Sequence, residues 1–215
     1  MPTVLSLLPE HRRETFARVA EVIRAGGIVA IPTESSYGLA VSPFDEDAVN
    51  RLYRIKDRAG DKPILVLIGD RAQLHSLVDT VTPAAELLMV SFWPGPLTIV
   101  MDALPVLPQA LTAGTGSLGV RLPSVPLLCD LLREVGPLTG TSANRTGEQP
   151  LETAHQVLSG LGGHVDLILD SGGTPGGLPS TVLDVRASVR LVREGAVPRT
   201  AIASVLKGLG VQLSS

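Results

Sequence analysis

Two spacings of hydrophobic side chains along the chain separate the segments expected to be helices from those expected to be strands. Where apolar residues recur at intervals of three and four, as at Phe16, Val19 and Ile23, they predict one face of a helix. Together with caps and breakers, this spacing predicts helices at residues 16–23, 45–53, 71–78, 83–92, 124–133, 153–158 and 198–206. Short aliphatic runs predict buried strands at residues 28–32, 63–69, 97–102, 119–122, 165–170, 181–185 and 189–193, and 138–142 as a short strand or turn.

The order of these segments predicts the fold class. Strands and helices mix throughout the chain, without a long linker or a repeat. Long connections through helices suit parallel strand pairs, whereas the short connection at residues 184–189 requires an antiparallel pair. We therefore expect one α/β domain over residues 10–207, built on a twisted, mixed parallel and antiparallel sheet flanked by helices. Residues 1–9 and 208–215 are interpreted as terminal extensions.

Composition excludes several classes of protein. Hydrophobic residues make up 44% of the chain and charged residues 18%, which is too apolar for a disordered protein. The single cysteine excludes an intrachain disulfide, and the sequence shows neither a signal peptide nor an apolar run of about 18 residues. The formal net charge of −3 argues against a generally basic nucleic-acid binder. We expect a soluble cytoplasmic protein without a membrane partner.

Familiar catalytic motifs are absent from the sequence or stand in the wrong context. Residues 114–119 match G-x-G-x-x-G, but they precede a predicted strand instead of joining a strand to a helix, so a turn-forming loop is the better interpretation. No Gly-Lys-Ser/Thr and no G-x-S-x-G occurs. The four histidines are scattered, so no zinc site is expected. Cys129, among leucines of a predicted helix, is interpreted as a core residue.

Four segments place polar side chains at the expected ends of helices or strands. Between Arg51 and Lys62 lie five basic and two acidic residues, and both a solvated surface and an anion clamp formed by Lys56 and Arg58 are open interpretations. The other segments are residues 31–39, 140–147 and 179–184. Their hydroxyl and amide side chains suit either turn formation or close contact with a polar ligand.

Taken in order, these segments resemble the YrdC-type family of threonylcarbamoyl-AMP synthases. The family pattern P-T-E-T-x-Y-G-L corresponds to residues 32–39, with Ser35 in place of the second threonine. Further matches are K-x-R at 56–58, F-W-P-G-P-L-T at 92–98, V-R-x-P at 120–123, S-x-N at 142–144, S-T-V-x-D at 180–184 and R-x-G at 193–195. Each motif is weak alone, but the ordered set is specific, and it resembles the short form with a single YrdC-like domain.

The resemblance implies a reaction and a set of site residues. Such enzymes make threonylcarbamoyl-AMP and pyrophosphate from L-threonine, bicarbonate or CO2, and ATP, with Mg2+ accompanying the nucleotide. It implies Lys56 and Arg58 as catalytic residues; Lys56, Arg58, Ser142, Asn144 and Arg193 as ATP-binding residues; and Thr33, Tyr37, Arg121, Thr141, Ser180 and Thr181 as threonine-binding residues. No metal-binding residues are assigned.

The resemblance also implies partners and leaves two alternatives open. The product of the family passes to a transferase complex that forms threonylcarbamoyladenosine at position 37 of tRNA. One alternative is a paralogue of the YciO type. The other is a non-catalytic module that binds tRNA or double-stranded RNA, although three Phe, two Tyr and one Trp leave few side chains for base stacking.

Overall fold

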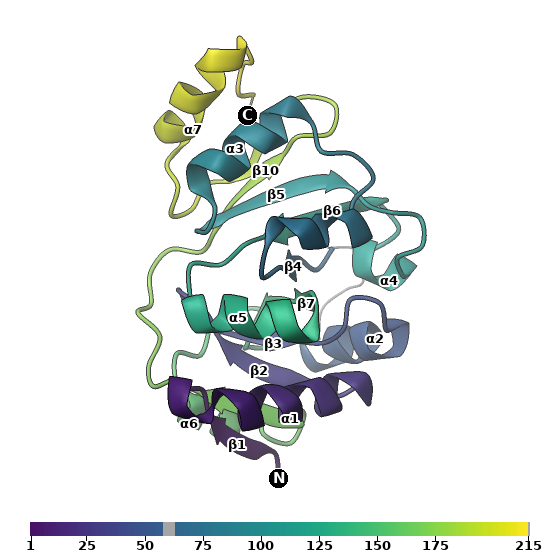
Figure 1. The fold of residues 1–215 in the computed structure, drawn as a ribbon, viewed down its shortest axis with the longest axis vertical. Coiled ribbons are helices and arrows are strands. Elements are labelled where there is room, and N and C mark those ends of the chain that lie inside the picture. The colour runs from purple at the N-terminus through teal and green to yellow at the C-terminus, as the bar shows by residue number, and fades with distance from the viewer. Residues whose placement is uncertain (58–62, 215) are drawn as a thin grey trace.

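The structure, a computed structural model, describes residues 1–57 and 63–214. Within these residues the strands form two mixed sheets stacked along the long axis of the molecule, and the chain termini lie toward its opposite ends (Figure 1). The predicted fold class is therefore confirmed, but the strands divide over two sheets where the sequence predicted one. Arg58 and Lys62, two of the basic residues noted above, lie outside the described residues.

The sheet nearer the N-terminus, sheet A, contains the first strands of the chain. Its order is β1 (Thr3–Ser6), β9 (Leu167–Asp170), β2 (Val29–Pro32), β3 (Tyr37–Ala40) and β8 (Thr141–Ser142). The first three strands are parallel to one another, while β3 is antiparallel to both β2 and β8. Residues 1–9 thus contribute β1 to the sheet, which the terminal-extension interpretation did not include.

The second sheet, sheet B, carries the central and C-terminal strands. Its order is β11 (Arg190–Arg193), β10 (Thr181–Asp184), β5 (Leu97–Asp102), β6 (Ser117–Arg121), β4 (Val66–Leu67) and β7 (Leu138–Thr139). The β10–β11 pair is antiparallel, as the short connection predicted. At the C-terminus, Ser214 forms a bridge with Arg190, so the last residues return to the edge of this sheet.

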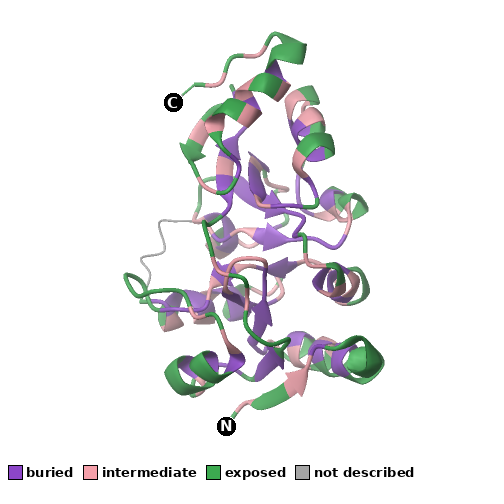
Figure 2. Ribbon diagram, turned by 90° about the vertical axis from the view of Figure 1, so that its left-hand side faces the viewer, coloured by how far each residue is buried: buried purple, intermediate pink, exposed green. Residues whose placement is uncertain are grey.

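Helices cover the sheets with their apolar faces. Around sheet A and the junction lie α1 (Arg12–Arg24), α2 (Glu46–Ile55), α5 (Pro126–Val135) and α6 (Ala154–Leu161); around sheet B lie α3 (Pro83–Phe92), α4 (Gln109–Thr112) and α7 (Arg199–Leu206). Short 3-10 helices are η1 (Pro9–His11), η2 (Arg71–Ser76) and η3 (Lys207–Leu209). Figure 2 shows buried residues concentrated in the strands and exposed residues on the outer helix faces.

Alternation along the strands of sheet A supplies two hydrophobic faces. Val29 and Ile31 pack with α1 and α5, whereas Ala30 and Ile28 pack into the larger core that continues into sheet B. Phe16 is fully buried in the first of these clusters, where the burial of such a side chain contributes about 1.5–3 kcal/mol. Cys129 is 4% exposed, consistent with its interpretation as a core residue.

Local signals placed several helix ends correctly. The Asp45 side chain accepts a hydrogen bond from the Ala48 amide and caps α2, and Thr153 forms a capping box with Gln156 at the start of α6. Other segments differ from the prediction: residues 71–76 form a 3-10 helix, the strand predicted at 63–69 is only β4, and β1, β3 and α4 were not predicted. No helix among the described residues has the length and apolarity to cross a bilayer.

Candidate functional site

The topology of sheet B brings four polar segments together at one end of its strands, which we call the site edge of the sheet. Because β10 is parallel to β5, while β6 and β11 run the opposite way, the starts of β5 and β10 lie beside the ends of β6 and β11. The corresponding side chains belong to Thr98, Arg121, Ser180 and Arg193. The Ser180 hydroxyl lies 2.9 Å from that of Thr98, and the Arg193 guanidinium donates to the Ser180 carbonyl at 2.8 Å.

Sheet A supplies the opposing edge through the β2–β3 hairpin. The register pairs Pro32 with Tyr37, so residues 33–36 form the turn. The Thr33 hydroxyl donates to the Ser36 carbonyl at 2.7 Å and fixes this turn. Strand β8 pairs with β3 through Gly38 and Ser142, which places the 142–146 loop beside the hairpin.

Two glycines allow this close packing. A Cβ at Gly140 would lie 2.7 Å from the Leu67 side chain, at the point where the chain leaves β7 of sheet B and enters β8 of sheet A. A Cβ at Gly38 would lie 3.3 Å from the Thr141 carbonyl. Gly140 therefore fits the chain where the two sheets meet, Gly38 allows β3 and β8 to lie close together within sheet A, and the polar loop after β8 is positioned by these contacts.

Lys56, at the C-terminal end of α2, holds the loop after β8. It is only 4% exposed, and its Nζ donates to the Ser142 carbonyl at 2.5 Å, to the Asn144 carbonyl at 2.9 Å and to Asn144 Oδ1 at 3.1 Å. The Ser142 hydroxyl in turn donates to Asn144 Oδ1 at 2.5 Å, and the Thr146 hydroxyl donates to the Lys56 carbonyl at 2.7 Å. An ammonium group with three N–H donors thus fixes the Ser142–Asn144 segment as a preformed polar surface.

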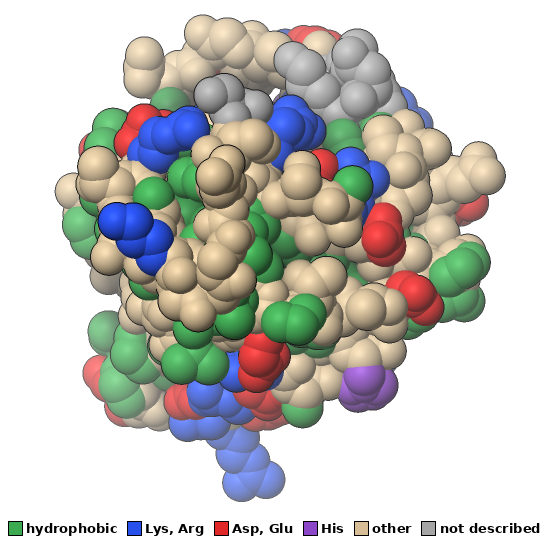
Figure 3. All heavy atoms as spheres, turned by 90° about the horizontal axis from the view of Figure 1, so that it is seen from above, with side chains coloured by type: hydrophobic (Ala, Val, Ile, Leu, Met, Phe, Trp, Pro, Cys, Tyr) green, Lys and Arg blue, Asp and Glu red, His purple; other side chains and the backbone are tan. Residues whose placement is uncertain are grey.

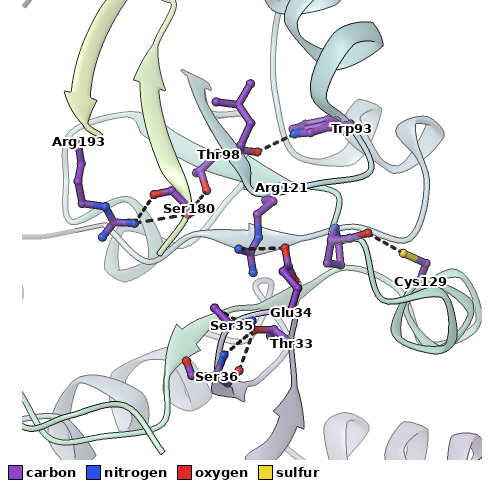
Figure 4. Close-up of polar contacts among 12 residues, drawn as sticks. Thr33, Glu34, Ser35, Ser36, Trp93, Thr98, Arg121, Cys129, Ser180 and Arg193 are labelled. Atoms are coloured by element: carbon purple, nitrogen blue, oxygen red, sulfur yellow. Dashed lines mark hydrogen bonds and ion pairs between the residues drawn. The ribbon is translucent and has the colours of Figure 1, made fainter. Parts of the chain in front are cut away.

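The two edges are joined by an ion pair between Glu34 of the hairpin and Arg121 at the end of β6. Arg121 Nη1 lies 3.4 Å from Glu34 Oε1, and the two side chains are 7% and 16% exposed. Figure 4 shows this pair between the Thr98–Ser180–Arg193 cluster and the Thr33–Ser36 turn. Burial lowers the pKa of Arg121, the Glu34 charge opposes that shift, and the Arg193 charge adds to it.

The structure brings most of the predicted site residues to these two facing edges. Arg121, Ser180, Thr181 and Arg193 lie at strand ends of sheet B, Thr33, Thr141, Ser142 and Asn144 lie in or beside the hairpin and β8 of sheet A, and Lys56 binds the loop after β8, whereas Arg58 lies outside the described residues. Several predicted site hydroxyls have protein partners, as described above for Thr33, Ser142 and Ser180, and the same holds for Tyr37 and Thr181. Tyr37 donates to the Gly172 carbonyl at 3.2 Å, and Thr181 donates to the Val197 carbonyl at 2.6 Å. Burial also raises the pKa of Tyr37.

Glu34 was not assigned a role by sequence reasoning, although it stands inside the most distinctive motif. Its position directly after a buried strand was the available signal, but only the tertiary structure places Arg121 opposite it. Within the described parts of the chain, no group of three or more His, Cys, Asp or Glu side chains could hold a metal ion. The side chains at the site are mainly cations, hydroxyls and amides, and these groups suit phosphate and carboxylate ligands.

The fold and site together define an α/β protein with a cation-rich polar site between two sheets, and comparison with known proteins places it further. The family model for Sua5, YciO and YrdC, described as "Telomere recombination", matches residues 21–195. This chain belongs to the Sua5/YciO/YrdC family.

Individual relatives agree with this assignment. A protein of Mycobacterium tuberculosis named putative threonylcarbamoyl-AMP synthase is 37% identical over 199 residues, covering 92% of each chain. The crystal structure of Pyrococcus abyssi Sua5 complexed with L-threonine superposes with a TM-score of 0.89 at 32% identity, covering 99% of this chain and 62% of that one. Escherichia coli YciO gives a TM-score of 0.82 at 26% identity, covering 94% and 98%.

Proposed function

We propose that this protein is an L-threonylcarbamoyladenylate synthase, which forms threonylcarbamoyl-AMP and pyrophosphate from L-threonine, bicarbonate or CO2, and ATP. The observation that carries the proposal is the similarity to relatives of that name and to a Sua5 structure holding L-threonine. In the proposed reaction, a carbamate oxygen of N-carboxylated threonine attacks the α-phosphorus of ATP. The new O–P bond forms as the bond to the β-phosphate oxygen breaks, and pyrophosphate leaves.

The residues of this chain support such a reaction by positioning and by charge. Lys56 holds the Ser142–Asn144 segment, within which the Ser142 hydroxyl donates to Asn144 Oδ1 and one Asn144 amide N–H donates to the Glu148 carbonyl. The second Asn144 N–H is proposed to meet a phosphate or ribose oxygen, and Arg193 at the end of β11 is proposed to supply a cation from sheet B. A transfer of this kind depends on alignment and on neutralising phosphate charge more than on covalent help from the protein. Lys56 and Arg58 remain the proposed catalytic residues, with Lys56 acting through the loop that its ammonium group holds.

Mg2+ is proposed to enter with the nucleotide as part of the substrate. The side chains at the site are mainly cations, hydroxyls and amides. Among the described residues, no cluster of carboxylates would hold the ion by itself. When bound to ATP it would neutralise phosphate charge. The proposed substrates and the proposed tRNA pathway of the product favour a cytoplasmic location.

Pyrophosphate release tests the proposal. The purified protein is incubated with Mg-ATP, L-threonine and bicarbonate, each omitted in turn, and the product is identified by its mass. Pyrophosphate and threonylcarbamoyl-AMP are expected only when all three substrates are present. ATP hydrolysis that does not depend on threonine would contradict the proposal. Lys207→Met, a substitution at an exposed lysine, serves as a control with unchanged turnover.

An activity of the YciO type is the second candidate, because the chain matches nearly the full length of YciO. Absence of threonine-dependent turnover in the same assay would favour it. RNA binding has less support: on the face shown in Figure 3, Lys and Arg side chains stand apart among acidic and hydrophobic ones. Hand-over of the product to a tRNA-modifying transferase remains part of the proposal.

A further inference from the structure

Glu34 and Arg121 form a buried ion pair that leaves much of its hydrogen-bonding capacity unused. Both carboxylate oxygens of Glu34 and the Nε atom of Arg121 are buried, and none has a hydrogen-bond partner among the described residues. Their shortest contact, 3.4 Å from Nη1 to Oε1, is longer than a charge-assisted hydrogen bond of about 2.7–2.9 Å. Buried polar atoms normally have partners, so this pair requires an explanation.

A closed Arg–Glu pair would not leave these atoms unpaired. An arginine fork commonly meets a carboxylate through two parallel bonds, which satisfies Nε and both oxygens at once. Here the side chains come from different sheets and meet at an angle that leaves Nε and Oε2 free for other partners (Figure 4). The arrangement therefore keeps one buried cation and one buried anion side by side, each able to bind a ligand group of opposite charge.

The ligand chemistry that satisfies both groups is a carboxylate next to an ammonium group, which is the zwitterion of an α-amino acid. Its carboxylate would pair with Arg121 and its ammonium group with Glu34. Figure 4 shows Thr33 and Ser180 on either side of the pair. Their hydroxyl groups already bond to the Ser36 carbonyl and the Thr98 hydroxyl, and their oxygen atoms can still accept a hydrogen bond from a polar side chain of that amino acid. The Arg193 charge also acts on Arg121, which favours a carboxylate over a second cation at this point.

We propose that Glu34 binds the α-ammonium group of the substrate amino acid and makes the site specific for a free, unsubstituted amine. This inference rests on the proposed function, because it takes L-threonine as the substrate. It adds a residue and a reason for specificity: the amine must be free before it can be carboxylated, and a buried carboxylate rejects ligands that lack the positive charge. The competing explanation is that Glu34 only balances the charge of Arg121.

Ligand affinity distinguishes these two explanations. Dissociation constants are measured in CO2-free buffer, by calorimetry or by competition, for L-threonine and for (R)-3-hydroxybutanoate, which lacks the amine. For the wild-type protein we expect threonine to bind at least about tenfold more tightly. In Glu34→Gln, which keeps the size of the side chain and removes its charge, this preference should fall to within about threefold. Glu10→Gln, the same substitution at an exposed site, should keep the wild-type preference.

Each outcome decides a different question. If Glu34→Gln weakens both ligands by the same factor, Glu34 acts only on Arg121 and the proposal is wrong. If the wild-type protein binds no threonine, the proposed function fails instead. Removing one member of a buried pair can prevent folding, so the wild-type protein supplies a second test. Its affinity for threonine should fall as rising pH deprotonates the amine of threonine, while its affinity for 3-hydroxybutanoate stays level over the same range; equal pH dependence would overturn the proposal.

Discussion

Replacing Lys56 with methionine should both destabilise the protein and abolish its turnover. The side chain is 4% exposed, and its ammonium group donates to the carbonyls of Ser142 and Asn144 at 2.5 and 2.9 Å and to Asn144 Oδ1 at 3.1 Å. A hydrogen bond to a charged group contributes about 1.5–3 kcal/mol, but the variant also avoids the cost of keeping an ammonium group out of water. We expect a net loss of about 2–4 kcal/mol in the free energy of unfolding.

Thermal unfolding and pyrophosphate release measure the two effects separately. At about 2–4 °C per kcal/mol for a protein of this size, Lys56→Met should lower Tm by at least about 4 °C. Lys207→Met makes the same chemical change at an exposed position and should leave Tm within about 1 °C. Turnover should fall at least about a hundredfold in Lys56→Met because the Ser142–Asn144 segment loses its support. A variant with wild-type Tm and turnover would refute both the Lys56 hydrogen bonds as a source of stability and Lys56 as a site residue.

Three further substitutions test how the site is held in place. Thr181→Val removes a buried hydroxyl that donates one hydrogen bond at 2.6 Å and accepts two at 2.9 and 3.1 Å. Urea unfolding should show a loss of about 2–4 kcal/mol in the free energy of unfolding, which Thr181→Ser largely avoids. Equal stability of the two variants would count against this role. Gly195→Ala would place a Cβ 2.1 Å from a backbone oxygen beside the site and should reduce both Tm and turnover, whereas Gly163→Ala, with no atom within 4 Å of its Cβ, should change neither. The hydrogen bond from Arg186 lowers the pKa of Asp184 below its unfolded value, so its stabilisation is present above about pH 4 and is lost as the pH falls through the folded pKa. Asp184→Asn should therefore be less stable than wild type at pH 7, by a difference that shrinks in acid; a difference independent of pH would contradict this assignment.

The extent of sequence-based prediction differs between elements for physical reasons. Helix α2 was predicted from its cap and its apolar face, both of which are local. Strand β3 was missed because its signal, Tyr37 to Ala40 with a glycine inside, is too short to separate from a turn, and it becomes a strand only by pairing with β2 and β8. The division into two sheets was also missed, because the chain changes partner at Gly140, from β4 in sheet B to β3 in sheet A, and both partner strands are distant in sequence.

In the candidate site, too, some features could be predicted from the sequence and others could not. Ordered motifs identified Lys56, Ser142 and Asn144 as site residues, and the structure brings them into direct contact. The motifs did not indicate that the donors of Lys56 are directed at the loop after β8, nor that the Tyr37 hydroxyl is directed at Gly172. The roles of such residues depend on which neighbours burial provides.

By itself, the sequence determined the fold class, the positions of most helices and strands, the aliphatic core and the family. The fold class, the element positions and the core follow from spacing, capping and composition, which act between residues close together in the chain, whereas the family follows from the resemblance of the ordered motifs. Only the tertiary structure decided how the two sheet edges face each other and that Glu34 meets Arg121 between them. Strand pairing and the burial of charge join residues that are distant in sequence, so their free energies depend on the whole folded chain and leave no local pattern from which they could be predicted.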